Sequence, residues 1–206
     1  MAYEIFKRLI DLVVALVLLI IFLPIWLIVP ILIKMDSNGP VIYLHRRLGK
    51  NGKEFSMYKF RSMIENADEE LYEKNPELLK EFKRGDWKLR DDPRITKLGK
   101  FLRAITIDEF PQLINVLRGD MSIVGPRAYL KVESEEQPKK YPKTKKLMKY
   151  ILSVKPGITG PWQTSGRNEI PFDKRAELDA EYAKTKSIGK DLIIMAKTPL
   201  AMISKW

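Results

Sequence analysis

Thr106-Ile107-Asp108-Glu109-Phe110-Pro111-Gln112-Leu113 sets two adjacent carboxylates before an apolar run in an otherwise strongly basic chain. The run is typical of a helix, and it ends at Arg118-Gly119, where a cation in the last turn precedes a glycine suited to a C-cap. The carboxylates therefore lie at the mouth of a predicted short helix. On this pattern alone they are explained most simply as capping residues.

The start of this helix has two interpretations. Thr106 and Glu109 have the spacing of a capping box, but that register places Pro111 where its missing N–H costs an intrahelical bond. With Asp108 as N-cap, the proline falls inside the first turn, where no partner is needed. We therefore favour a helix that begins near Asp108.

The composition limits the chemistry that this chain can perform. It has 206 residues with 37 Lys and Arg against 26 Asp and Glu, and a net charge of +11 favours phosphates, nucleic acid or an acidic membrane surface as partners. It has no Cys and one His, which excludes a disulfide framework, a thiolate nucleophile and zinc sites of the Cys/His type. Any catalysis must use carboxylates, hydroxyls and cations.

The N-terminal residues 1–35 predict a membrane helix. No residue from Leu12 to Ile33 is charged, and an apolar run of this length is the usual signal of a membrane segment. Pro24 lies just past its middle and predicts a bend. Basic residues flank the run on both sides, so the positive-inside rule places both ends in the cytosol. A re-entrant helix that turns at Pro24 fits these features better than a transmembrane anchor, which remains the alternative.

A small β-hairpin follows. Val41–Leu44 and Glu54–Phe60 are typical of strands, and Asn51-Gly52 between them suits a primed turn. Alternation along the second strand extends its apolar face with Lys59 and Arg61. These two cations are either phosphate contacts or solvated residues at a strand end.

The remaining pattern predicts mostly helices, so we expect an α+β fold that is mostly helical. Residues 36–186 are interpreted as a cytosolic catalytic domain, with 64–92 as a peripheral charged insertion. A loop at 154–163 is dense in Pro and Gly and carries Trp162, which is typical of a segment that lines a site. Residues 187–206 predict an amphipathic helix at the membrane interface, although core packing explains the same pattern.

Seven blocks follow one another along the chain in an order that is informative. They are the apolar helix with Pro24, Tyr58-Lys59-Phe60-Arg61-Ser62-Met63, Asp92-Pro93-Arg94-Ile95-Thr96, the segment from Asp108 to Ser122, Gly125-Pro126-Arg127, Lys155-Pro156-Gly157-Ile158-Thr159-Gly160 and Ser165-Gly166-Arg167-Asn168. In these blocks the sequence resembles the bacterial sugar transferases, the monotopic polyprenyl-phosphate phosphoglycosyl transferases. The resemblance covers nearly the whole chain.

The resemblance implies transfer of a sugar 1-phosphate from a UDP-sugar to a polyprenyl phosphate such as undecaprenyl phosphate, with release of UMP. It implies magnesium as cofactor and a place at the cytosolic face of the bacterial inner membrane, among membrane lipids. Asp108 matches the carboxylate that forms a covalent phosphosugar intermediate, and Glu109 is expected to orient it or the metal. Such an attack requires cations that offset the repulsion between two anions.

The resemblance also assigns residues that bind the substrate phosphates. Together with the strand pattern, it makes these the expected contacts: Lys59, Arg61, Arg103, Gln112, Arg127 and Arg167. Neither source reveals which sugar is transferred, and both leave open whether the chain forms a homodimer.

Two other functions remain open on the residues alone. A membrane-anchored basic module that binds nucleic acid or anionic lipid accounts for the net charge, but the chain lacks an aromatic-basic nucleic-acid motif, so we expect no nucleic-acid partner. A metal-dependent phosphohydrolase would use the same carboxylates with water as acceptor. The acceptor of the sugar phosphate, a lipid phosphate or water, distinguishes the transferase from the phosphohydrolase.

Overall fold

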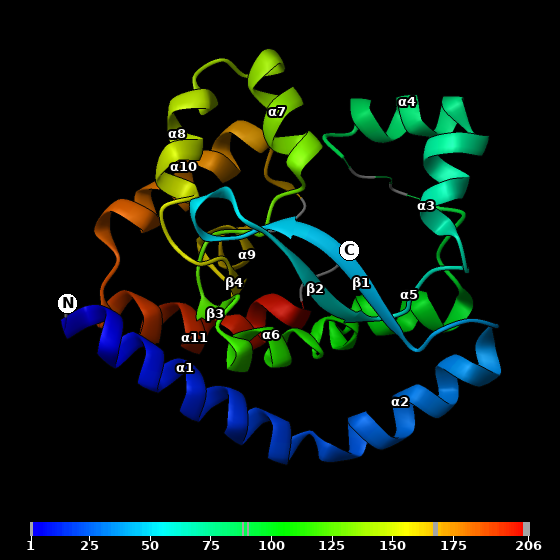
Figure 1. Cartoon of the computed structure of the whole chain (residues 1–206), viewed down its shortest axis with the longest axis horizontal. Helices are drawn as coiled ribbons and strands as arrows, with labels where there is room; N and C mark the ends of the chain where they lie inside the picture. The colour runs from blue at the N-terminus through cyan, green and yellow to red at the C-terminus, as the bar shows by residue number, and fades with distance from the viewer. Residues whose placement is uncertain (1, 88, 90, 167–168, 204–206) are drawn as a thin grey trace.

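The computed structural model describes residues 2–87, 89, 91–166 and 169–203, and the expected α+β class with a small antiparallel hairpin is confirmed (Figure 1). Helices form most of the molecule, and two short sheets lie among them. The elements after the N-terminal helices are β1 (Ile42–Leu48), β2 (Glu54–Phe60), α3 (Ala67–Glu69), η2 (Glu70–Lys74), α4 (Pro76–Arg84), α5 (Lys97–Ala104), η3 (Ile107–Glu109), α6 (Gln112–Arg118), β3 (Ser122–Val124), α7 (Lys131–Lys140), α8 (Thr144–Ile151), β4 (Gly157–Thr159), α9 (Pro161–Thr164), α10 (Phe172–Thr185) and α11 (Ile188–Ile203).

The N-terminal apolar segment is a bent pair of helices. α1 (Ala2–Ile21) and α2 (Leu23–Asp36) meet at 62° around Phe22, and Pro24 occupies the first turn of α2, where its missing N–H costs nothing. Within the described ranges no single helix is long and apolar enough to cross a membrane, whereas the bent pair is by length and composition. Both ends of the pair turn toward the rest of the molecule (Figure 1). The predicted bend is therefore present.

In α1 the apolar side chains are exposed and charged side chains are buried, the reverse of a helix on the surface of a water-soluble domain. Its outward side exposes large apolar residues such as Leu9 and Ile20, while Lys7 and Asp11 are buried against the domain. α2 also exposes apolar side chains, including Leu27 and Ile31. A continuous exposed apolar surface of this kind marks a lipid or protein contact.

Asp11 anchors α1 to the domain through hydrogen bonds in a buried site. Its carboxylate accepts from Lys7 at 2.9 Å, from the Ser122 hydroxyl at 2.8 Å and from the Ile123 backbone N–H at 2.9 Å. Lys7 also lies 3.5 Å from Asp191 on α11. Because buried charges are tolerated only when paired and hydrogen-bonded, this network fixes how α1 sits on β3 and α11.

The hairpin pairs β1 and β2 from Ile42 opposite Phe60 to Leu48 opposite Glu54. Both turn residues, Asn51 and Gly52, have positive φ, as the primed turn requires. The first strand is longer than the predicted Val41–Leu44, because His45, Arg46 and Arg47 pair with β2 although their side chains are not typical of a strand.

A second sheet was not anticipated by the sequence. β3 follows α6 and pairs in parallel with β4, which lies inside the segment interpreted as a Pro/Gly-rich loop. Gly157 faces Gly125 so closely that a Cβ would collide with its backbone N. The glycines therefore serve close strand approach as well as turning.

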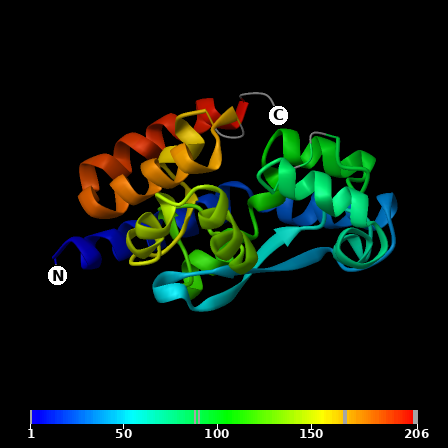
Figure 2. The ribbon, with the colours of Figure 1, turned by 90° about the horizontal axis from the view of Figure 1, so that it is seen from above.

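The remaining helices surround this framework. Asn75-Pro76 divides the charged insertion, as is typical of an Asn-Pro pair, and the Asn75 side chain caps α4 by accepting from Leu78 N at 3.0 Å. α10 packs on α8, and seen from above α10 and α11 lie on one side of the molecule with the β1–β2 hairpin on the other (Figure 2). α11 buries Asp191 and Ile194 while it exposes Leu192, Ile193 and Leu200.

Replacing Asp11 tests the importance of the buried anchor. Asp11→Ala should lower the free energy of unfolding by about 3 kcal/mol, because it leaves Lys7 and two other donors without their acceptor. Urea unfolding in detergent measures the change. Glu4→Ala is the matched control on the same helix, because Glu4 forms an exposed ion pair with Lys186 and should cost less than about 1 kcal/mol. Equal small effects in both variants would contradict the anchoring role.

Candidate active site

The backbone around the carboxylate pair differs from both predicted registers. Ile107–Glu109 forms a 3-10 turn, η3, and α6 begins only at Gln112. Thr106 has a left-handed φ of 60°, and neither its side chain nor that of Asp108 caps the helix. Pro111 explains the difference, because its missing N–H cannot join a helical ladder and the chain tightens into i→i+3 bonds instead. The capping explanation of the carboxylates is therefore wrong, whereas Gly119 ends α6 with φ 87° as predicted.

Asn115 fixes α6 against the hairpin. Its side-chain oxygen accepts from Tyr58 N at 2.9 Å, and its nitrogen donates to Ser56 O at 2.8 Å. The buried amide thus binds the edge of β2 as a neighbouring strand would. This contact sets the position of Lys59, the next residue along β2, relative to the carboxylates before α6.

Lys59 bridges the two carboxylates. Its Nζ donates to Glu109 Oε1 at 2.8 Å and lies 3.9 Å from Asp108 Oδ2. Asp108 is only 5% exposed, whereas the side chain of Glu109 is 31% exposed. The pair thus presents one buried and one more accessible carboxylate beside a cation.

The pKa of Asp108 is raised to about 6, mainly by burial of the carboxylate and also by the negative charge of the neighbouring Glu109. Lys59 and Arg103 act in the opposite direction, because a nearby positive charge favours the ionised form. Asp108 is consequently ionised at neutral pH but poorly solvated. This combination suits a nucleophilic carboxylate.

The backbone of Arg127 belongs to a buried hydrogen-bond network. Its backbone N–H and the Tyr129 hydroxyl each donate to Asp179 Oδ2 at 3.0 Å. Its guanidinium lies 5.0 Å from the centre of the Trp162 ring, with Arg175 at 5.6 Å from the same ring. Burial raises the pKa of Asp179 to about 7. Trp162 comes from the loop expected to line a site, whereas nothing in the charged pattern of α10 distinguished Asp179.

The structure also places three other residues that were expected to bind the substrate. Arg103 lies within electrostatic range of Asp108, and Gln112 is buried at the start of α6. Arg61 is engaged elsewhere: its guanidinium donates to the backbone carbonyls of Ser37, at 2.7 Å, and Asn38, after the end of α2. Arg167 lies outside the described residues.

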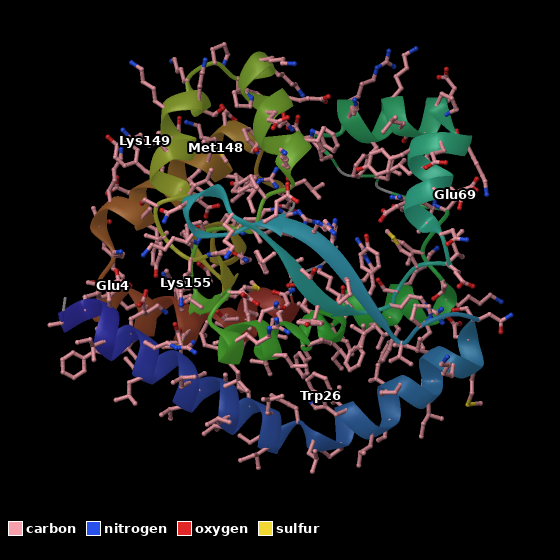
Figure 3. All side chains as sticks on the ribbon, viewed as in Figure 1. Glu4, Trp26, Glu69, Met148, Lys149 and Lys155 are labelled. Atoms are coloured by element: carbon pink, nitrogen blue, oxygen red, sulfur yellow. The ribbon has the colours of Figure 1, made fainter. Side chains whose placement is uncertain are left out.

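The bend of the apolar helices lies next to this site. The rings of Phe22, at the bend, and Phe110, two residues after Asp108, are 4.9 Å apart. Trp26 points from α2 toward the domain and lies 5.4 Å from the ring of Phe60 (Figure 3). The carboxylate pair is thus adjacent to the middle of the exposed apolar surface.

The donor set around Asp108 limits how a metal ion could be held. Within the described residues no group of three or more His, Cys, Asp or Glu side chains is arranged for a metal. Asp108 and Glu109 offer two carboxylates, which fits a magnesium ion that takes its other ligands from substrate phosphates and water.

Comparison with known proteins agrees with this arrangement. The sequence profile described as bacterial sugar transferase matches residues 2–205. The exopolysaccharide production protein ExoY of Sinorhizobium fredii is 40% identical over 97% of this chain and 86% of its own. The undecaprenyl-phosphate galactose phosphotransferase of Salmonella typhimurium is 41% identical over 97% of this chain but 40% of its own. The UDP-glucose:undecaprenyl-phosphate glucose-1-phosphate transferase of Klebsiella pneumoniae is 39% identical over 94% of this chain and 39% of its own. Because the profile spans nearly every residue, from the bent helices to α11, this chain belongs to the bacterial sugar transferase family.

Proposed function

We propose that this chain transfers a sugar 1-phosphate from a UDP-sugar to polyprenyl phosphate, with release of UMP, as the first membrane step of a glycoconjugate pathway. The names of two relatives support these substrates, because both contain undecaprenyl phosphate and one contains UDP-glucose. The observation that carries the proposal is the buried carboxylate Asp108, with a raised pKa, beside the bend of an apolar helix pair.

The reaction divides into two half-steps at Asp108. In the first, a carboxylate oxygen attacks the sugar-bearing phosphorus of the UDP-sugar, and the bond from that phosphorus to the bridging oxygen breaks, so that UMP leaves. In the second, an oxygen of polyprenyl phosphate attacks the same phosphorus, and the bond to Asp108 breaks. The products are polyprenyl diphosphosugar and the original carboxylate.

The charges around Asp108 have distinct tasks in this proposal. Lys59 and Arg103 offset the repulsion between the carboxylate and the diphosphate, and Arg127 contacts the phosphates from the side of Trp162. Glu109 keeps Lys59 in place through their 2.8 Å hydrogen bond. Asp108 and Glu109 would hold magnesium, which when bound neutralises charge on the diphosphate.

The bent helix pair gives the acceptor a route to the site. We propose that α1 and α2 enter and leave the same leaflet at the cytosolic face of the bacterial inner membrane. Their apolar residues then face lipid, and the bend at Phe22 reaches the hydrocarbon beside Phe110. Polyprenyl phosphate can thereby approach Asp108 from the membrane while the soluble donor arrives from the cytosol.

A labelled donor tests the proposal against its alternatives. The protein is incubated with UDP-sugar carrying a radioactive sugar, magnesium and polyprenyl phosphate. Label in the lipid phase supports transfer to polyprenyl phosphate. Water-soluble sugar phosphate would instead indicate a phosphohydrolase, and unchanged UDP-sugar across a panel of donors would contradict both enzymatic functions.

Asp108→Asn should abolish UMP release and at the same time stabilise the protein. The variant removes the nucleophile and also a charge whose burial shifts the pKa from 3.8 to about 6, which corresponds to at most about 3 kcal/mol at neutral pH. Thermal unfolding and UMP release measure the two effects. Asp173→Asn, in the first turn of α10, is the matched control and should change neither. Retained turnover in Asp108→Asn would refute its role as nucleophile.

The pH dependence of kcat/KM should show an acid limb near pH 6, because Asp108 attacks only when ionised. Lys59→Met removes a cation that lowers this pKa, so its limb should move to higher pH. Glu109→Gln removes a repulsive charge, so its limb should move to lower pH. UMP release measured from pH 5 to 8, in roughly half-unit steps, resolves these shifts. A limb that stays at the same pH in both variants would show that another group titrates.

Single cysteines test the re-entrant arrangement, since the chain has none. Cysteines introduced at Ala2 and Ser134 should respond alike to a membrane-impermeant thiol reagent in intact cells. Both should become reactive only after the cells are opened. Labelling of position 2 alone from outside would establish a span across the membrane.

A further inference from the structure

A basic pocket lies at the N-terminal end of α1, well away from the carboxylate pair. It is a depression open to solvent with a cavity volume of about 50 Å³, between the first turns of α1 and the residues Lys50, Val154 and Lys155. Glu4 and Lys155 lie at this end of the molecule (Figure 3). Five cations line the pocket: Lys7, Arg8, Lys50, Lys155 and Lys186.

Two of these cations are already neutralised. Lys7 forms ion pairs with Asp11 and Asp191, and Lys186 lies 2.6 Å from Glu4. Their charges therefore contribute little to attraction of a further anion.

The other three cations form no ion pair with a carboxylate among the described residues. Arg8 donates to the Val116 and Leu117 carbonyls, at 2.6 and 2.8 Å, and these are neutral partners. Among the described residues neither Lys50 nor Lys155 has a carboxylate within ion-pair distance. Burial lowers the pKa of Lys155, and so do the charges of Arg8 and Lys50, while Asp11 and Glu4 act in the opposite direction and only partly offset them. An anion placed between the three cations would relieve their repulsion.

Gly119 brings two of these cations together. A Cβ at this position would lie 3.4 Å from the Lys155 ammonium and 3.7 Å from Arg8 Nη2. Both groups thus converge on the end of α6, where no side chain separates them. Two cations that converge on one point are a suitable recognition element for the oxygens of one phosphate group.

The position of the pocket favours a lipid as the source of that phosphate. Ile5, Phe6 and Leu9 are exposed on the same turns of α1, more than half of each side chain being accessible. Cations beside an exposed apolar helix face lie at the level of lipid headgroups when that face contacts hydrocarbon. At 1.5 Å per residue, Lys7 is also about 20 Å along the helix from the bend at Phe22 and its neighbour Phe110.

We propose that this pocket binds the phosphate of an anionic membrane lipid, held by Arg8 and Lys155 with Lys50 at the entrance. The site is separate from the acceptor site at Asp108. It rests on contact between α1 and the membrane and not on the proposed transfer reaction. A bound headgroup would neutralise the three cations and hold the N-terminal end of α1 at a constant depth.

Native mass spectrometry of the full chain in detergent tests this proposal. The protein is mixed with equal amounts of phosphatidylglycerol and phosphatidylcholine, and the lipid molecules retained per protein are counted. Phosphatidylglycerol should be retained preferentially. The double variant Lys50→Gln and Lys155→Gln should reduce its retention about tenfold or more, at roughly 1 kcal/mol for each lysine.

The control variant loses the same charge from another exposed helix. Lys190→Gln with Lys197→Gln, both exposed on α11, should retain phosphatidylglycerol within about twofold of the unaltered protein, as expected when no specific contact is lost. Equal losses in both double variants would overturn the site in favour of diffuse attraction. Thermal unfolding in detergent, with a midpoint unchanged in both double variants, verifies that they fold.

Inorganic phosphate distinguishes the two sources of the anion. If the pocket takes a lipid, millimolar phosphate should leave phosphatidylglycerol retention unchanged, because the free ion gains no apolar contact. Displacement of the lipid by phosphate at this concentration, or equal retention of both lipids, would overturn the proposal of a lipid site.

Discussion

The buried pairing of Lys7 and Asp11 with Asp191 is the constraint on which the rest of the structure depends. A helix that exposes apolar side chains outward could otherwise rotate or slide on the domain at little cost. Each shift would leave one of these charges buried without its partner, which costs several kcal/mol. Arg8 adds a second attachment, because it binds the last carbonyls of α6, the helix that follows the carboxylate pair. The position of α1 and that of the candidate active site are therefore set by one rigid connection.

The same structure pays a cost at Asp108 that it avoids at Asp11. Asp11 accepts hydrogen bonds from several donors. The Lys59 ammonium, in contrast, lies 3.9 Å from Asp108, beyond hydrogen-bond distance, and a second carboxylate lies beside Asp108. Its pKa of about 6 lies above the ordinary 3.8, so protonation favours the folded state. The stabilising effect is complete below about pH 4 and is lost as the pH rises through about 6. At neutral pH the fold must hold an unfavourable charge, and the Asn115 contacts with β2 supply local rigidity for this purpose.

Features set by local chemistry could be predicted from the sequence. The bend beside Pro24, the turn at Asn51-Gly52, the division at Asn75 and the end of α6 at Gly119 each depend on a few neighbouring residues. Features set by distant partners could not be predicted. Asn115 binds β2, Asp179 holds Arg127, and Arg61 binds carbonyls after α2, all across at least twenty residues. The start of α6 was missed for a different reason: a 3-10 turn and a capped helix share the same sequence signal, and Pro111 decides between them.

The bend also supports the proposed covalent intermediate over a single direct transfer. The contact between Phe22 and Phe110 places the apolar helices next to Asp108. Arg127, which lies over the Trp162 ring, comes instead from the domain that follows these helices. A direct transfer would require a water-soluble diphosphate and a long-chain lipid phosphate to bring their anionic groups to one small site at once. Their mutual repulsion would add to that of Asp108 and Glu109. In the proposed two-step reaction the phosphosugar is attached to Asp108, so that UMP would leave before the second anion enters. Lys59 and Arg103 then need to offset the charge of only one substrate phosphate at a time.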